Sequence, residues 1–121
     1  MIEFDDLAAI AKQEFADIVV STVVIDAKLR IILVDNSYID FWWSQVLPGR
    51  YAHHWERRHL DGSIYRHDNA PHPQWQAVLT YPKHFHDGSD ANISESNLGG
   101  TPESALREFL DFARRMLARS G

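Results

Sequence analysis

The sequence predicts an α+β fold, in which one antiparallel β-sheet meander of about five to seven strands has an N-terminal and a C-terminal helix packed on one face. Segments with helical periodicity stand near the two ends of the chain, at residues 3–16 and 102–119. The stretch between them is rich in β-branched and aromatic residues and is divided by turn-forming dipeptides. Because β and α segments do not alternate along the chain, a parallel sheet is not expected.

Each predicted helix combines an apolar stripe with a polar start. In the first helix, Asp5 and Asp6 lie where the helix dipole favours negative charge. Its stripe consists of Phe4, Leu7, Ala8, Ala11 and Phe15. In the second helix, Thr101 supplies a capping hydroxyl and Pro102 occupies the first helical position. Its stripe consists of Leu106, Phe109, Leu110, Ala113, Met116 and Leu117.

Five apolar segments between the helices are predicted to be strands. Residues 17–26 and 29–35 are rich in β-branched side chains and are predicted to form a hairpin. Residues 38–46 carry aromatic side chains on both faces, which is typical of a central strand. A strand-like apolar run follows at residues 75–81, and a short strand is expected at residues 93–96.

The dipeptide Asp61-Gly62 predicts a two-residue hairpin turn within residues 51–69. This turn would place Arg58 opposite Tyr65 and Trp55 opposite Asp68. Because side chains alternate across a strand, one face would carry Trp55, Arg57, His59, Ile64, Arg66 and Asp68. The other face would carry His54, Glu56, Arg58, Tyr65, His67 and Asn69. Neither face is apolar, so this hairpin is interpreted as an edge or as the wall of a groove.

Length and composition indicate one globular domain over residues 1–121. The chain has no cysteine, which excludes disulfides and a cysteine nucleophile and fits a reducing compartment. The N-terminus carries acids where a signal peptide would be basic, and no apolar run is long enough to cross a bilayer. We therefore expect a cytoplasmic protein with no membrane partner.

Basic and titratable side chains are concentrated in one part of the chain. The formal net charge is −5, which argues against a general nucleic-acid coat protein. Residues 50–86 nevertheless contain five basic and three acidic residues, a net of +2 that leaves −7 for the remainder. All seven histidines lie in this window. Histidine and arginine donate to phosphate, and histidine moves protons near neutral pH, so the window predicts a site for an anionic substrate. A solvated polar hairpin is the alternative interpretation.

The H-x-H pair at His84 and His86 has two chemical interpretations. In an extended segment both rings point to the same side and can reach one metal ion or one phosphate. A metal would need a further ligand, such as His72 or Asp68. The site is instead predicted to work without a metal or other cofactor, because cysteine is absent and the histidines are needed for proton transfer and phosphate contact. In addition, Asp68 and Asp87 are the only acids close in sequence that could orient the rings.

A metal-free site of this composition fits RNA cleavage through the 2′-hydroxyl. That reaction needs a base, an acid and cations beside the phosphate. The predicted catalytic residues are His72, His84, His86, Arg66 and Asp68. The predicted substrate-binding residues are Asn69, Lys83, Arg57 and Trp55. For Trp55 and the other tryptophans, packing in the core is the competing role.

Two short elements stand out in residues 50–86, R-x-D-N-x-P-H at residues 66–72 and P-x-H-x-H at residues 82–86. With them, the chain resembles over about residues 26–117 the TumE-type toxins of bacterial and archaeal toxin–antitoxin modules. The resemblance implies a growth-inhibiting toxin and a small helix-turn-helix antitoxin as partner. RNA as substrate follows by analogy with other small toxins.

Two other functions and the assembly state are left open by the sequence. The chain could be a non-catalytic module whose groove binds an anionic ligand or a partner. It could also be a metal-binding regulatory protein. A homodimer is compatible with the sequence, and nothing in the residues specifies how an antitoxin neutralises the protein.

Overall fold

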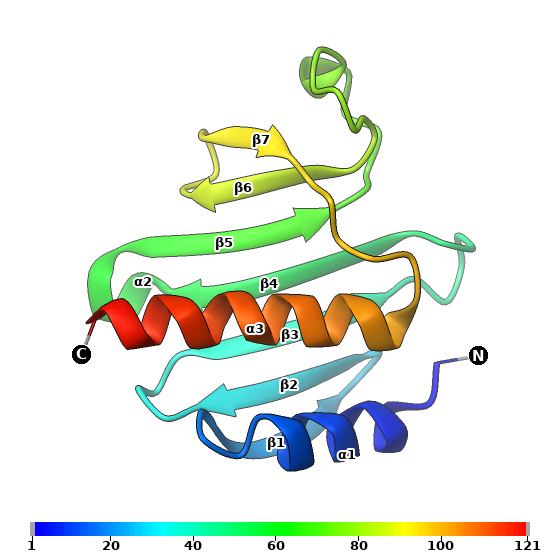
Figure 1. Ribbon diagram of the computed structural model, residues 1–121. Helices are drawn as coiled ribbons and strands as arrows, with labels where there is room; N and C mark the ends of the chain where they lie inside the picture. The colour runs from blue at the N-terminus through cyan, green and yellow to red at the C-terminus, as the bar shows by residue number, and fades with distance from the viewer. Residues whose placement is uncertain (1, 121) are drawn as a thin grey trace.

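The computed structural model describes residues 2–120, in which seven strands form one antiparallel sheet in the order β1-β2-β3-β4-β5-β6-β7 (Figure 1). The strands are β1 Val19–Ile25, β2 Lys28–Leu33, β3 Tyr38–Trp43, β4 Tyr51–Arg57, β5 Ser63–Asp68, β6 His84–Gly88 and β7 Ile93–Glu95. The helical elements are α1 Phe4–Glu14, α2 Arg58–Asp61, the 3-10 turn Pro73–Trp75 and α3 Pro102–Ser120. The predicted meander with a helix at each end is confirmed.

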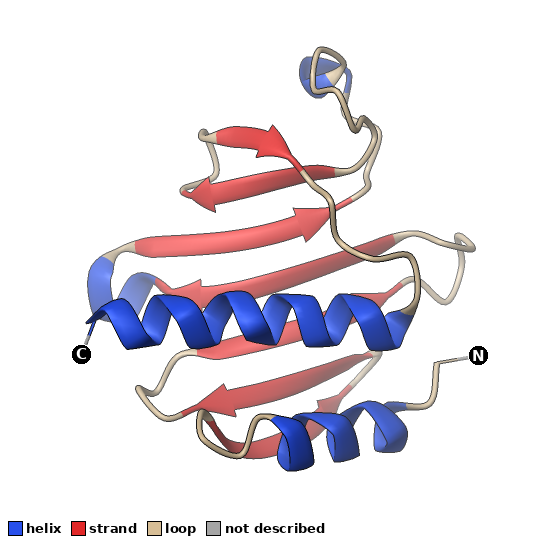
Figure 2. Cartoon of the chain, in the orientation of Figure 1, coloured by secondary structure: helices blue, strands red, loops and turns tan. Residues whose placement is uncertain are grey.

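The helices α1 and α3 pack on the same face of the sheet, as predicted (Figure 2). Leu7 of α1 and Phe109 of α3 belong to one buried cluster with Leu29 of β2, Phe41 of β3 and Trp55 of β4. These strand residues all point toward the helices, because alternate positions of a strand share a face. We call this side the helix face and the opposite side the open face.

The connection between β4 and β5 differs from the predicted two-residue turn. Residues 58–61 form the short helix α2, and Gly62 ends it in the left-handed conformation, at φ 81°. This helix moves the strand pairing by three residues, so that Trp55 lies opposite Tyr65 rather than Asp68. A shift by an odd number exchanges faces, and the predicted faces are therefore wrong. Tyr65 shares the helix face with Trp55, whereas Asp68 lies on the open face.

Residues 75–81 do not form the predicted strand. Trp75 ends the 3-10 turn Pro73–Trp75, and the residues after it continue as turns in which Leu79 is 85% exposed. Strand β6 already pairs with β5 on one side and with β7 on the other, so it offers this segment no free edge. The flanking prolines also lack the N–H groups that a ladder requires.

Replacing a buried and an exposed leucine by alanine tests this division of the chain. Leu110→Ala removes a fully buried side chain from α3 and is expected to lower the free energy of unfolding by about 2–5 kcal/mol. Leu79→Ala, the same substitution at an 85% exposed position, is expected to change it by less than about 0.5 kcal/mol. Chemical denaturation checks both values, and a large loss at Leu79 would contradict the exposed turn.

Candidate functional site

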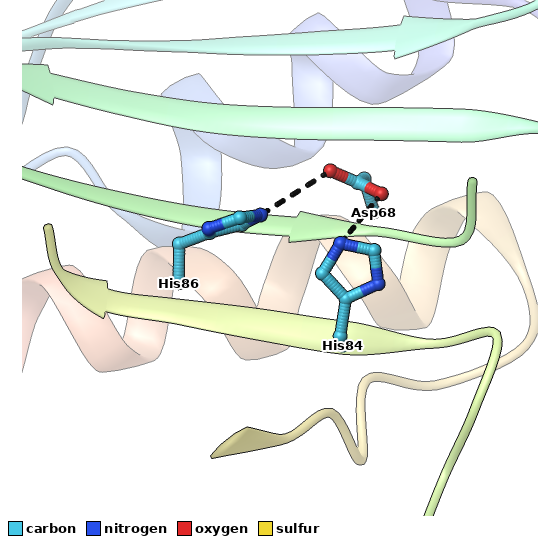
Figure 3. A group of neighbouring side chains, drawn as sticks. All are labelled: Asp68, His84 and His86. Carbon is cyan, nitrogen blue, oxygen red and sulfur yellow. Dashed lines mark ion pairs between the residues drawn. The ribbon is translucent and has the colours of Figure 1, made fainter. Parts of the chain in front are cut away.

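One carboxylate and two imidazoles meet on the open face where β5 pairs with β6 (Figure 3). Asp68 lies directly opposite His84, and His86 follows two positions later on the same side of the strand. The Nε2 atom of His84 is 3.0 Å from Asp68 Oδ1, and the Nε2 atom of His86 is 3.6 Å from Asp68 Oδ2. All three side chains are buried, with His84 fully inaccessible. We call Asp68, His84 and His86 the DHH cluster.

Backbone groups fix the orientation of each member of the DHH cluster. His84 Nδ1 is 2.9 Å from the carbonyl oxygen of Pro82, and His86 Nδ1 is 2.9 Å from that of Asp90. A carbonyl oxygen can only accept, so Nδ1 carries the hydrogen in both rings. The backbone N–H of Ala70 donates to Asp68 Oδ1 at 3.0 Å. Both Nε2 atoms are thereby directed at the carboxylate.

The close contacts shift the pKa values of Asp68 and His86 in opposite directions. Burial alone would raise the pKa of Asp68, but the contacts from His86 and the Ala70 N–H outweigh it and lower this pKa. Burial alone would lower the pKa of His86, but the Asp68 carboxylate and the Asp90 carbonyl outweigh it and raise this pKa. A negative charge on Asp68 is thus held beside the His86 ring, whose protonated form it favours.

A row of charged and polar side chains crosses the open face and ends at His86 of the DHH cluster. Its members lie on β2 to β6: Arg30, Asp40, His54, Arg66 and His86. Arg30 is held by Asp40 through two hydrogen bonds of 2.8 and 2.9 Å. Arg66 donates to His54 Nδ1 at 3.2 Å and, within residues 2–120, has no carboxylate partner. Arg66 therefore offers an uncompensated positive charge next to His86.

The predicted substrate-binding residues Trp55 and Arg57 make contacts within the protein itself. Trp55 is fully buried, and its indole N–H donates to the Ser37 hydroxyl. Arg57 pairs with Asp35 at 2.6 Å and with Asp61 at 3.3 Å. The structure thus places both side chains among structural contacts at the far end of β4, away from the DHH cluster.

Asn69 and Lys83 flank the DHH cluster in sequence but have other partners. The Asn69 side chain accepts from the Tyr51 N–H and donates to the Gly49 carbonyl, which ties the β3–β4 loop to the end of β5. Lys83 points to the helix face, where its Nζ donates to the Leu98 carbonyl at 2.9 Å. It lines a cavity of about 370 Å³ near the start of α3, which also includes Arg50 and His53.

Two side chains from the segment between β5 and β6 approach the DHH cluster. The exposed ring of His72 has its centroid 6.4 Å from that of His84. The ring of Trp75 lies 6.2 Å from His84 and 6.3 Å from His86. His72 was among the predicted catalytic residues, whereas Trp75 and His54 were not predicted to be near the site. Only the register of the strands reveals His54. From the sequence, Trp75, like the other tryptophans, could stack on bases, although core packing is the favoured role for most of them.

The histidines His53 and His67 face the core instead of the open face. His53 is 1% exposed and contacts Phe41 and Tyr51, and burial lowers its pKa to about 3. His67 lies against Phe109, and burial lowers its pKa to about 4. Both rings are therefore neutral near pH 7 and pack against aromatic side chains.

Fold and site together define a small α+β protein with a one-sided helical cover and a histidine–carboxylate cluster on the open face of its sheet. A family model described as Toxin TumE matches residues 6–117, and the chain belongs to this toxin family. The family implies an antitoxin as partner. No curated protein and no solved structure matches the chain. Within residues 2–120, no helix is both long and apolar enough to span a membrane.

The burial of His53 makes stability depend on pH. Its pKa is about 3 in the folded protein, against about 6.5 for an ordinary histidine. Between these values the unfolded chain binds a proton that the folded chain does not. Stability that is present above about pH 6.5 is therefore lost on acidification, by about 1.4 kcal/mol per pH unit for this ring. His67, which pairs with His53 across the strands, adds a loss of the same sign.

Denaturation at about pH 7 and about pH 5 tests this dependence. His53→Phe keeps a ring among Phe41, Trp43 and Tyr51 and is expected to reduce the loss of stability between the two pH values. The same substitution at the exposed His59 is the control and should leave the loss as in wild type. An unchanged loss in His53→Phe would contradict the assignment.

Proposed function

We propose that this chain is the toxin of a toxin–antitoxin module, and that it inhibits growth in the cytoplasm by cleaving RNA at the DHH cluster. The observation that carries the proposal is the buried, backbone-fixed convergence of Asp68, His84 and His86 beside the uncompensated Arg66. Such an arrangement is costly to bury and is typical of functional sites, and Arg66 supplies a cation for an anionic substrate. Membership of a toxin family supplies the biological setting.

RNA cleavage through the 2′-hydroxyl fits the groups on the open face. The 2′-oxygen attacks the adjacent phosphorus, and the bond from phosphorus to the 5′-oxygen breaks. The 2′-hydroxyl loses its proton and the leaving 5′-oxygen gains one, giving a 2′,3′-cyclic phosphate and a 5′-hydroxyl. In this proposal His84 and His86, with Asp68, assist these proton transfers, and Arg66 beside them stabilises charge on the phosphate.

Two further side chains support this placement. His72 is exposed on the segment that approaches His84, so it can contact a bound substrate without any rearrangement of the core. Trp75 presents a ring beside both cluster histidines, and aromatic rings stack on unpaired bases. Neither α1 nor α3 covers the open face, so the partly exposed Arg66 can contact single-stranded RNA or a helix-turn-helix antitoxin there.

Expression without the antitoxin is expected to slow growth, and Asp68→Asn or His86→Ala is expected to relieve the effect. Either variant removes a charge or a ring from the DHH cluster, and loss of one acid–base group lowers cleavage by about 10²–10⁴-fold. His72→Ala tests the contribution of the loop. His59→Ala removes an exposed histidine of α2 and should remain as toxic as wild type at equal protein level.

The RNA itself distinguishes a nuclease from a non-catalytic binding module. Cells expressing wild type should accumulate fragments with cyclic phosphate and 5′-hydroxyl ends, and cells expressing folded Asp68→Asn should not. Growth arrest without new RNA ends would contradict RNA cleavage and would favour the binding module. Equal toxicity of wild type and all three cluster and loop variants would remove the site from the mechanism.

A further inference from the structure

We infer that the DHH cluster binds one divalent first-row transition-metal ion through His84 Nε2, His86 Nε2 and a carboxylate oxygen of Asp68 (Figure 3). The three potential ligand atoms lie within 4.8 Å of one another. The inference concerns the cluster of the proposed function, and it holds whether or not RNA is the substrate.

The tautomers of the two histidines leave their Nε2 lone pairs directed at the carboxylate. Each Nδ1 hydrogen is donated to a backbone carbonyl, at Pro82 for His84 and at Asp90 for His86. In a neutral ring Nε2 is then an acceptor. Two acceptor nitrogens beside an acceptor carboxylate repel one another unless a cation lies between them. The cluster therefore requires either added protons or a metal ion.

The contact between His84 and Asp68 favours a metal ion over a proton. Their atoms are 3.0 Å apart, yet His84 Nε2 is buried without a hydrogen-bond partner, because the direction of approach does not suit one. A shared proton must lie near the line between donor and acceptor. A metal ion lies off that line, at the apex of the angle between its ligands. Ligands at metal–ligand distances of about 2.0–2.2 Å stand roughly 3–3.5 Å apart, which fits this pair.

The surroundings of the DHH cluster also match those of metal-binding histidines. Such rings usually donate their other N–H to a carbonyl or a carboxylate, which fixes the ring and strengthens the ligand. The sequence suggested that only Asp68 and Asp87 could play this orienting role. The structure shows that the carbonyls of Pro82 and Asp90 do so instead, which frees Asp68 to act as a ligand. The expectation of a metal-free site rested on the absence of cysteine, on the competing proton-transfer role of the histidines and, in addition, on this missing support.

The donor set indicates the class of metal. Two imidazoles and one carboxylate suit Zn²⁺, Mn²⁺, Fe²⁺, Co²⁺ or Ni²⁺, whereas Mg²⁺ and Ca²⁺ prefer oxygen ligands. Three protein ligands leave at least one coordination position open, which is typical of catalytic rather than structural sites. The exposed His72 and the ring of Trp75 lie near the two cluster histidines. A metal ion there would polarise a phosphate oxygen or a hydroxyl group of the substrate.

Metal titration of the full chain tests the inference. Protein made without a histidine tag is stripped with a chelator and then titrated with Zn²⁺, Mn²⁺ and Ni²⁺ in separate calorimetric runs. One equivalent is expected to bind, with a rise in Tm because the ion binds only the folded cluster. Asp68→Asn and His86→Ala should each lose the binding and the rise in Tm. His59→Ala removes one exposed imidazole outside the cluster and should bind as wild type does.

Two results would overturn the inference. One is the absence of saturable binding for all three ions to folded wild type. The other is unchanged binding in folded Asp68→Asn and His86→Ala, with circular dichroism used to confirm folding. The titration measures metal binding, so a failure of the inference is distinct from a failure of the proposed function. A protein that is toxic and cleaves RNA without binding metal would support metal-free chemistry at the same residues.

Discussion

The pairing of β5 with β6 is the constraint on which the site depends. It places Asp68 opposite His84, and the two-residue period of a strand brings His86 to the same side. A displacement of this pairing by one residue would turn Asp68 toward the helix face while the histidines stayed outside. The pairing is held on both sides, because β5 also pairs with β4 and β6 also pairs with β7. The site is therefore built on the interior of a sheet rather than on a loop.

The one-sided position of α1 and α3 divides the polar residues of the chain into two groups with different roles. On the helix face, His53 and His67 lie among aromatic rings, and burial keeps them neutral. On the open face, His84 and His86 share a carboxylate, which favours a positive charge between them. The same residue type thus serves packing on one side and chemistry on the other, and alternation along the strand decides which.

Periodicity and turn signals predicted the class of fold, both long helices and the short strand β7, because these depend on local sequence. The connection after Arg57 could not be predicted this way. Asp61-Gly62 suits a tight turn, but it also suits the end of a helix with Gly62 as cap, and only packing decides between them. The error moved the register by three residues and concealed the neighbours of His54. Lys83 and Trp55 were predicted to bind substrate because they lie close in sequence to the cluster histidines or to Arg57. Sequence proximity does not show which face of the sheet a side chain takes, and the structure places both on the helix face.

Nitrogen NMR of the histidine side chains tests the central claim, that backbone contacts direct both cluster rings at Asp68. The measurement uses metal-free protein at about pH 9, where ordinary imidazoles are neutral. The account predicts that His84 and His86 both carry their hydrogen on Nδ1, with Nε2 unprotonated. A hydrogen on Nε2 of either ring, with Nδ1 free, would mean that the ring does not hold its carbonyl contact. That result would contradict the convergence of the DHH cluster.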